Sequence, residues 1–432
     1  MTTVAQKKKP YFGLTGGWLT FWITVACATD MTLFGYDQGV FIHDLVGPTK
    51  TTMLSTVTAI YDIGCFFGAL VAFTIGEHLG RKKAILLGTT IMAVGGILQA
   101  SSFSLAQMFV GRIVLGLGND YCLSTMSKLI TIFGATGNQG GSVIDAILAD
   151  TQLSKEFKIR GITRDTTKKS AQDLAKRGVD VVSADLGSVD TLTAALKGSH
   201  TVFLVTNYWE TMNPDIEFSQ GKNVTDVSKA IGVSHLIFSS LHHVTEETKG
   251  RLSHVPHFDS KASIEKYIRA SGVGCSFVLP GYYMSNFTQM LSRAEDGSYQ
   301  LFYPVGKQAQ FPLFDAAQDT GLFVRAAIKH AGQLKDKQIL AAAKYYTPEE
   351  IVDTFSKVTG KKAVFVQVSS DQYKASLPAA IADEYLENQL FVEEPGYYLG
   401  EPLEPSLSLL DSKPTTWEEF VKKNVSAWKQ VT

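Results

Sequence analysis

Cysteine is scarce in this chain of 432 residues, and its distribution excludes two common uses of the thiol. The four cysteines, Cys27, Cys65, Cys122 and Cys275, show no CxxC spacing, so neither a zinc site nor a disulfide framework is predicted. The chain also has no large excess of positive or negative residues, since its net charge is −1 at pH 7. With no basic stripe and no helix-turn-helix spacing, we expect no direct binding to nucleic acid and no metal.

Charged residues are nearly missing from long stretches before residue 120. Gly13–Thr29 and Ala84–Ser102 contain none, Thr51–Gly76 contains only Asp62, and Leu105–Asn119 contains only Arg112. A membrane-spanning helix needs about 20 mainly apolar residues. This part of the sequence therefore predicts about four transmembrane helices.

Two basic clusters give these predicted helices an orientation. Lys7–Lys9 precede the first span, and Arg81–Lys83 lie between the second and the third. Positive residues favour the cytoplasmic side. After four spans, the rest of the chain is then expected to face the cytoplasm.

Three short motifs in this region resemble the sugar-porter branch of the major facilitator superfamily. They are Phe34–Val40 (FGYDQGV), Gly76–Lys83 (GEHLGRKK) and Gly111–Asn119 (GRIVLGLGN). The resemblance ends near Asp120, so residues 1–120 are interpreted as a truncated transporter segment that contacts a membrane through residues 10–120. Family members have two halves with the substrate between them, and transport by this fragment is therefore not expected.

Residues 121–126 form the junction, and no Gly-, Pro- or Ser-rich linker separates the two parts. Met126 stands directly before the first strand of the next domain. Two interpretations stay open. The chain is a fusion attached to a membrane, or two reading frames have been joined and a cytoplasmic protein begins at Met126.

A glycine-rich loop opens the second part of the chain. Leu129–Phe133 is a β-branched run, Gly134–Gly140 (GATGNQG) follows, and Gly141–Leu148 has apolar residues at helical spacing. This order of strand, loop and helix predicts an α/β Rossmann fold that binds a dinucleotide. The loop residues expected to hold the cofactor are Gly134, Thr136, Gly137, Asn138, Gln139 and Gly140.

Later strands add residues to the same predicted site. The strand Phe157–Thr163 ends at Arg164, with Lys168 close by. A guanidinium suits a 2′-phosphate, so NADP is favoured, with NAD as the alternative. Further strands are predicted at 179–183, 201–206, 235–240 and 275–279. Since ligands bind outside the carboxyl ends of strands, Asp185 is expected near the adenine, and Thr206 and Asn207 near the nicotinamide.

Through four sequence motifs, residues 127–432 resemble the NmrA-like family of atypical short-chain dehydrogenases. They are the glycine loop, Leu279–Phe287 (LPGYYMSNF), His257–Lys261 (HFDSK) and Tyr346–Val352 (YTPEEIV). The resemblance implies NAD(P) binding by a Rossmann core over about 127–280 and a smaller C-terminal α/β lobe over about 281–432. Tyr282, Tyr283, Phe287 and Phe302 are candidates to line the cleft between them.

The resemblance also implies a catalytic pair, of which one member differs here. Dehydrogenases of this superfamily use a Tyr as general acid with a Lys four residues later. This sequence has His257 and Lys261 at those places. Lys261 is expected to position the nicotinamide ribose, while His257 either transfers protons or only packs at the start of its helix.

Two functions follow from this pattern. The first is an NADP(H)-binding, redox-sensing regulator that acts through protein partners with little turnover, as the resemblance implies for several family members. The alternative is an NADPH-dependent reductase of a small carbonyl or related substrate that uses Lys261.

Overall fold

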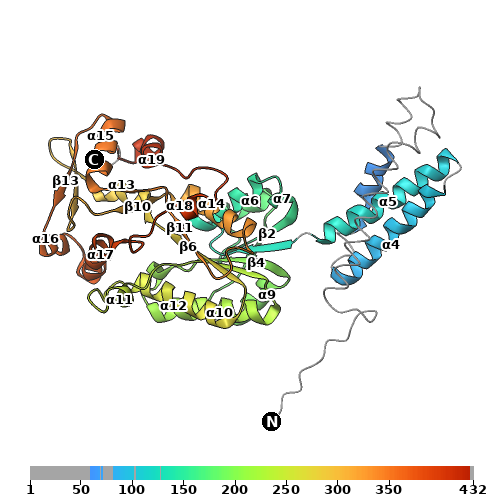
Figure 1. Cartoon of the computed structure of the whole chain (residues 1–432), viewed down its shortest axis with the longest axis horizontal. Helices are drawn as coiled ribbons and strands as arrows, with labels where there is room; N and C mark the ends of the chain where they lie inside the picture. The colour runs from blue at the N-terminus through green and yellow to red at the C-terminus, as the bar shows by residue number, and fades with distance from the viewer. Residues whose placement is uncertain (1–58, 69, 72–80, 102–103, 127, 429–432) are drawn as a thin grey trace, which may run out of the picture. The chain divides into compact units, whose positions relative to one another are not determined.

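The structure is a computed structural model that describes residues 59–68, 70–71, 81–101, 104–126 and 128–428. The chain divides into two compact units, Met1–Ser127 and Lys128–Thr432. Figure 1 shows the elements of each unit. The two units are described separately below.

In the first unit, residues 59–68 are helical, and α4 (Arg81–Ala100) and α5 (Leu105–Met126) follow. The helices approach closely at glycines. A Cβ added at Gly95 would lie 2.5 Å from the Leu115 nitrogen, and one at Gly118 would lie 2.5 Å from the Met92 nitrogen. Small residues at helix contacts are common in membrane proteins.

The prediction of four transmembrane helices finds no support in the described residues, where no helix is long and apolar enough to cross a membrane. Helices do form at the third and fourth predicted spans. However, the sequence of α4 begins with Arg81, Lys82 and Lys83, and that of α5 includes Arg112 and Asp120, so charges interrupt or shorten both apolar stretches. The first predicted span, residues 13–29, lies outside the described residues, as does most of the second.

The second unit is built on a seven-stranded sheet in the order β11-β6-β5-β4-β1-β2-β3. All neighbouring strands run parallel. The strands are β1 (Lys128–Ile132), β2 (Phe157–Thr163), β3 (Asp180–Ser183), β4 (Ser199–Leu204), β5 (His235–Ser239), β6 (Cys275–Pro280) and β11 (Gln338–Ala341). The central strands are almost fully buried, which is typical of a parallel sheet covered on both faces.

Helices cover both faces of this sheet (Figure 1). On one face α6 (Asn138–Ala149) packs against α14 (Ala316–Lys329), where the Gly321 nitrogen donates to Ser142 Oγ at 2.9 Å. The other face carries α9 (Val189–Leu196), α10 (Pro214–Ile231) and α12 (Pro256–Ser271). Short helices α7 (Leu153–Glu156), α8 (Lys169–Lys176) and α11 (Val244–Glu247) complete this part.

The first six strands lie where the sequence predicts them, with ends shifted by one or two residues. The region expected to form the lobe, residues 281–432, also contributes to the Rossmann core, because β11 pairs with β6 in the main sheet and α14 packs against α6 on its face. The chain leaves the sheet after β6 and returns to pair β11 with the edge of β6. Strand β11 is only four residues long, and nothing in its sequence predicts which sheet it joins.

The remaining residues form the lobe. One small sheet contains β7 (Tyr282–Tyr283), β10 (Phe311–Phe314) and β12 (Lys344–Tyr346), and another contains β8 (Leu291–Arg293), β9 (Tyr299–Tyr303) and β13 (Ala363–Gln367). The lobe helices are α13 (Phe287–Met290), α15 (Pro348–Thr359), α16 (Ser370–Ala375), α17 (Ala379–Phe391), α18 (Glu404–Leu407) and α19 (Trp417–Asn424). Capping boxes at Thr347 and Thr416 begin α15 and α19.

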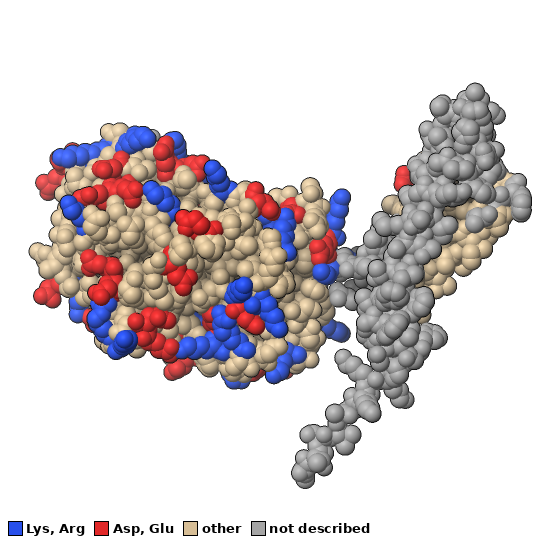
Figure 2. All heavy atoms as spheres, viewed as in Figure 1, with Lys and Arg blue, Asp and Glu red and all other residues tan. Residues whose placement is uncertain are grey.

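Acidic and basic side chains alternate over the visible face of the second unit, and neither sign gathers into one large patch there (Figure 2).

Candidate active site

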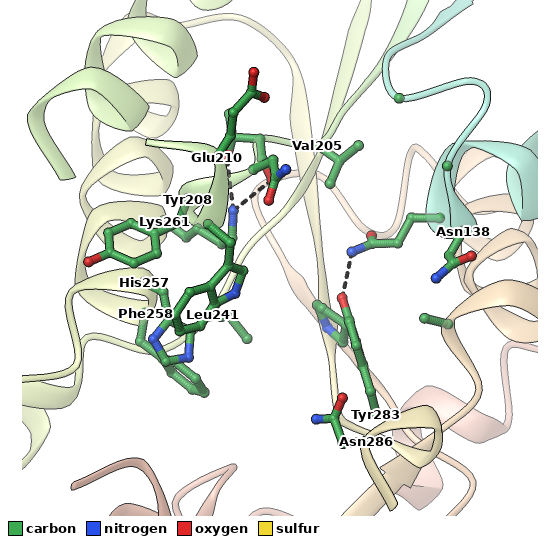
Figure 3. Close-up of a pocket in the computed structure, with 18 of the residues that line it drawn as sticks. Asn138, Val205, Tyr208, Glu210, Leu241, His257, Phe258, Lys261, Tyr283 and Asn286 are labelled. Atoms are coloured by element: carbon green, nitrogen blue, oxygen red, sulfur yellow. Dashed lines mark hydrogen bonds between the residues drawn. The ribbon is translucent and has the colours of Figure 1, made fainter. Parts of the chain in front are cut away.

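One cavity of about 1490 Å³ lies at the carboxyl ends of the main strands and extends to the lobe. Every residue that the sequence predicts for the cofactor lines it. These residues are Gly134, Thr136, Gly137, Asn138, Gln139, Gly140, Arg164, Lys168, Asp185, Thr206, Asn207 and Lys261, and His257 lines it too. Figure 3 shows His257, Phe258 and Lys261 on one side of this cavity, with Asn138 and Tyr283 on the other.

The glycine loop has the geometry that a phosphate group requires. Gly134 has a φ of +62°, which favours glycine. A Cβ at Gly140 would lie 2.6 Å from the Phe133 carbonyl oxygen, so only glycine lets α6 come this close to β1. Gly137 caps α6 without a side-chain hydrogen bond to the first turn. Helix N–H groups are therefore left for an anion, and these residues fit a dinucleotide pyrophosphate.

Arg164 follows β2 as predicted, and its guanidinium is paired with Glu210. Glu210 belongs to the short helix η2 (Tyr208–Glu210), which follows β4. Both side chains are substantially exposed, at 72% and 43%. A 2′-phosphate would compete with Glu210 for Arg164. The sequence gives no signal for this pairing, since 46 residues separate the two positions.

Lys261 lies on α12, and its ammonium group is held entirely by the protein. Nζ donates to the Thr206 carbonyl oxygen at 3.1 Å, to Thr206 Oγ1 at 2.8 Å and to the Glu217 carboxylate. Glu217 is only 1% exposed and also accepts hydrogen bonds from Thr206 Oγ1 and Ser260 Oγ. The buried carboxylate thus fixes Lys261 and balances its charge. Sequence reasoning missed Glu217.

His257 is held by a second buried carboxylate. Its Nδ1 is hydrogen-bonded to Glu384 of α17. The ring centroid lies 4.9 Å from the indole of Trp209 and 4.9 Å from the ring of Phe258. The ring therefore packs in an aromatic cluster and also lines the cavity. Glu384 is 127 positions away in the chain and was not predicted.

Two tyrosines that line the same cavity, Tyr208 and Tyr283, have raised pKa values. Burial, together with Glu384 and Glu217, raises the pKa of Tyr208 to about 12. Burial also raises the pKa of Tyr283 to about 12, and its hydroxyl accepts a hydrogen bond from Gln139 Nε2 at 2.8 Å. Phenols with such pKa values release a proton less readily than an ordinary tyrosine.

Three of the four aromatic residues predicted for the cleft line the cavity, namely Tyr282, Tyr283 and Phe302. Phe287 does not, because it is fully buried and packs with its ring centroid 5.1 Å from that of Trp417. An aromatic side chain in a sequence does not reveal whether it faces a cavity or the core.

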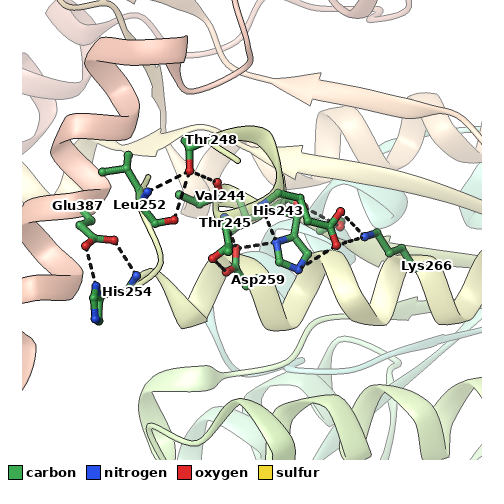
Figure 4. A network of polar contacts seen from close by, with 12 residues as sticks. His243, Val244, Thr245, Thr248, Leu252, His254, Asp259, Lys266 and Glu387 are labelled. Atoms are coloured by element: carbon green, nitrogen blue, oxygen red, sulfur yellow. Dashed lines mark hydrogen bonds and ion pairs between the residues drawn. The ribbon is translucent and has the colours of Figure 1, made fainter. Parts of the chain in front are cut away.

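The segment before α12 is tied to the lobe by another histidine–glutamate pair (Figure 4). His254 Nδ1 lies 2.7 Å from Glu387 Oε1, and the His254 nitrogen donates to Glu387 Oε2 at 2.6 Å. The hydrogen bond and charge of Glu387 raise the pKa of His254. Two histidines three residues apart thus meet two glutamates, Glu384 and Glu387, that are also three apart on α17.

No group of three or more His, Cys, Asp and Glu side chains is arranged to hold a metal ion in the part of the chain that the structure describes.

Comparison with known proteins identifies both parts of the chain. The family model described as "NmrA-like family" matches residues 126–421. The chain belongs to the NmrA-like family. A model described as "Sugar (and other) transporter" matches residues 17–131.

Curated relatives differ between the two parts of this NmrA-like protein. It is 33% identical over 259 residues to the NmrA-like oxidoreductase ptmS of Penicillium ochrochloron, covering 56% of this chain and 76% of that protein. The corresponding oxidoreductase malD of Malbranchea aurantiaca is 32% identical over 57% of this chain and 78% of its own length. The MFS-type transporter oryC of Aspergillus oryzae is 76% identical over 29% of this chain, which spans only 25% of that transporter.

Solved structures share the fold of the second unit. A crystal structure of the negative transcriptional regulator NmrA with NADP has a TM-score of 0.60 at 21% identity, covering 71% of this chain and 98% of that one. The NADPH-dependent quinone oxidoreductase QOR2 of Escherichia coli, with NADPH, has a TM-score of 0.57 at 25% identity, covering 68% and 99%.

Proposed function

We propose that residues 128–428 form an NADP(H)-dependent oxidoreductase, with NAD as the alternative cofactor. The observation that carries the proposal is that one cavity joins the glycine loop to His257 and then extends along the lobe. It thus offers room for a second molecule beside a dinucleotide. The relatives ptmS and malD are named oxidoreductases and QOR2 is named an NADPH-dependent quinone oxidoreductase, which supports the same class of activity.

The loop Gly134–Gly140 would hold the pyrophosphate, and Arg164 with Lys168 the 2′-phosphate. Asp185 would border the adenine. Thr206 and Asn207 would border the nicotinamide ribose, and Lys261 would orient it by exchanging one of its two contacts with Thr206 for a ribose hydroxyl. When bound, NADPH supplies a hydride for an electrophilic carbon of the substrate.

His257 would hold the proton that the reduced substrate takes up. Because Glu384 bonds Nδ1, the proton to be donated would reside on Nε2. The buried carboxylate of Glu384 would orient the ring and balance the imidazolium. Glu384 is thus a positioning residue and His257 the general acid.

Turnover of NADPH with a panel of quinones and carbonyl compounds tests this proposal. We expect His257→Ala to lower kcat by about 10²- to 10⁴-fold without changing the affinity for NADP. Glu387→Gln is the matched control, because Glu387 pairs with the other histidine and does not line the cavity. Unchanged turnover in His257→Ala would refute the role of His257.

A second candidate is a regulator that binds NADP(H) with little turnover and acts through a protein partner. It is favoured by the missing tyrosine at position 257 and by the commitment of the Lys261 ammonium group to Glu217. This function predicts tight binding of NADP(H) with no NADPH consumption across the panel. Turnover with any member of the panel would count against it.

For the first unit we propose attachment to a membrane, with the NmrA-like unit facing the cytoplasm. The match to sugar transporters supports this location, and transport is not part of the proposal because the chain spans a quarter of the transporter it resembles. Carbonate extraction of membranes from cells expressing the full chain tests it. Recovery of the full chain in the soluble fraction would contradict the proposed attachment.

A further inference from the structure

Charged side chains line only one side of the cavity. Those that line it are Arg164, Asp165, Lys168, Asp185, Glu210 and Lys261, all of which precede residue 280. Among the described residues that line it beyond residue 280, none is charged. A charged molecule held against the lobe would lose hydration without gaining an opposite charge there.

The lobe side of the cavity is lined by aromatic rings and amide groups instead of charged groups. Tyr282, Phe302, Tyr303, Tyr373 and Tyr385 line this wall. Burial raises the pKa of Tyr282 to about 12 and also raises that of Tyr303 well above its ordinary value, so both phenols are neutral at physiological pH. Such a surface favours a flat, apolar ring system, because aromatic groups gain from burial and from edge or stacked contacts.

Gln389 of α17 lies in this wall and is only 1% exposed. Its Nε2 donates to Tyr282 Oη at 3.0 Å. Its Oε1 is buried and has no hydrogen-bond partner among the described residues. A buried acceptor without a donor is costly, so the amide oxygen is suited to a donor that arrives with a ligand.

Among the described residues no group donates a hydrogen bond to that oxygen, although Tyr373 also lies within hydrogen-bonding reach of the Gln389 amide. Tyr282 Oη lies 2.9 Å from Tyr303 Oη, and these hydroxyls lie 3.3 Å and 2.8 Å from Met290 Sδ. The two phenols are thus engaged with each other, with the thioether and with Gln389 Nε2.

We propose that the lobe side of the cavity binds an uncharged aromatic molecule and that Gln389 Oε1 accepts a hydrogen bond from a hydroxyl or N–H group on it. This inference rests on the proposed function, for which it names the substrate class. Gln389 is then a residue that determines specificity and takes no part in proton transfer.

Binding of three matched probes to the full chain, with NADP⁺ saturating, tests the proposal without requiring turnover. The probes are naphthol, methoxynaphthalene and naphthoate, substituted at the same ring position, and their affinities are measured by calorimetry. We expect naphthol to bind about ten-fold more tightly than methoxynaphthalene, as the loss of a donor to a buried acceptor implies. We expect naphthoate to bind more weakly than either.

Gln389→Leu should remove the preference for naphthol over methoxynaphthalene and leave NADP⁺ affinity unchanged. Asn388→Leu is the control, since Asn388 is the neighbouring amide on α17 and lines the same cavity but is only partly buried and has no buried oxygen without a partner; this variant should keep the preference. Naphthoate binding as tightly as naphthol in the unaltered chain would overturn the proposal, and this comparison needs no variant. A preference that survives in a folded Gln389→Leu would also overturn it.

The two proposals can fail separately. Absence of NADPH turnover with selective naphthol binding would reject the oxidoreductase and keep the aromatic compartment. NADPH turnover without selective naphthol binding would keep the oxidoreductase and reject the aromatic compartment.

Discussion

Replacing Gly140 by alanine tests the close approach of α6 to β1. The new Cβ would lie 2.6 Å from the Phe133 carbonyl oxygen and even nearer to that of Gly134, whereas real Cβ atoms essentially never come within 3.0 Å. Both neighbours are backbone atoms, so no side chain can rotate away. The start of α6 must therefore withdraw by at least about 0.7 Å to clear the Gly134 carbonyl oxygen. Overpacking of this kind costs about 1–3 kcal/mol, and the displaced N–H groups should bind NADP more weakly.

The next residue supplies the control. A Cβ at Gly141 would lie 3.7 Å from the Ala135 carbonyl oxygen, which is an ordinary contact. Because glycine is a poor helix former, Gly141→Ala should stabilise the protein by about 0.5–1 kcal/mol. Urea unfolding and NADP titration are measured for both variants of the full chain. Equal stability and equal NADP affinity in the two variants would refute the reasoning.

Three further predictions concern the charged pairs. Arg164→Ala should weaken NADP binding by about ten-fold or more and leave NAD binding nearly unchanged; equal losses for both cofactors in a titration would contradict it. Glu217→Ala should destabilise the second unit by about 3–5 kcal/mol, because it leaves Lys261 buried and unpaired, and urea unfolding measures this. Glu387 raises the pKa of His254 above 6.5, the usual value for histidine. The ion pair should therefore contribute its full stabilisation below pH 6.5. That contribution should be lost as the pH rises through the raised pKa of His254. A Tm profile between about pH 5 and pH 8 should show this loss, and Glu387→Gln should flatten it.

Much of the cofactor side of the site could be predicted because its residues are close to one another in the sequence. The glycine loop lies between β1 and α6, and Arg164 and Thr206 follow the ends of β2 and β4. Parallel strands bring their carboxyl ends to one edge of the sheet. A local order of strand and loop is therefore enough to predict which residues line the cavity.

The carboxylates could not be predicted in the same way. Glu217 contacts Lys261, which is 44 positions away in the sequence. Glu384 contacts His257, which is 127 positions away. A glutamate in a helix usually faces solvent, and its sequence neighbours do not reveal a buried partner. The roles of His257 and Lys261 depend on these two contacts, and so the sequence alone left proton transfer and packing as open alternatives.

The return of α14 and β11 to the main sheet limits how the lobe can be exchanged or moved. The polypeptide passes between sheet and lobe after β6, before α14 and after β11, and the Leu340 nitrogen of β11 also donates to Ser406 Oγ at 2.9 Å. A chimaera that takes its lobe from a relative must be spliced at all of these crossings. Any rotation of the lobe against the main sheet would have to hinge at these same crossings, so a substitution in one of them would act on all the others.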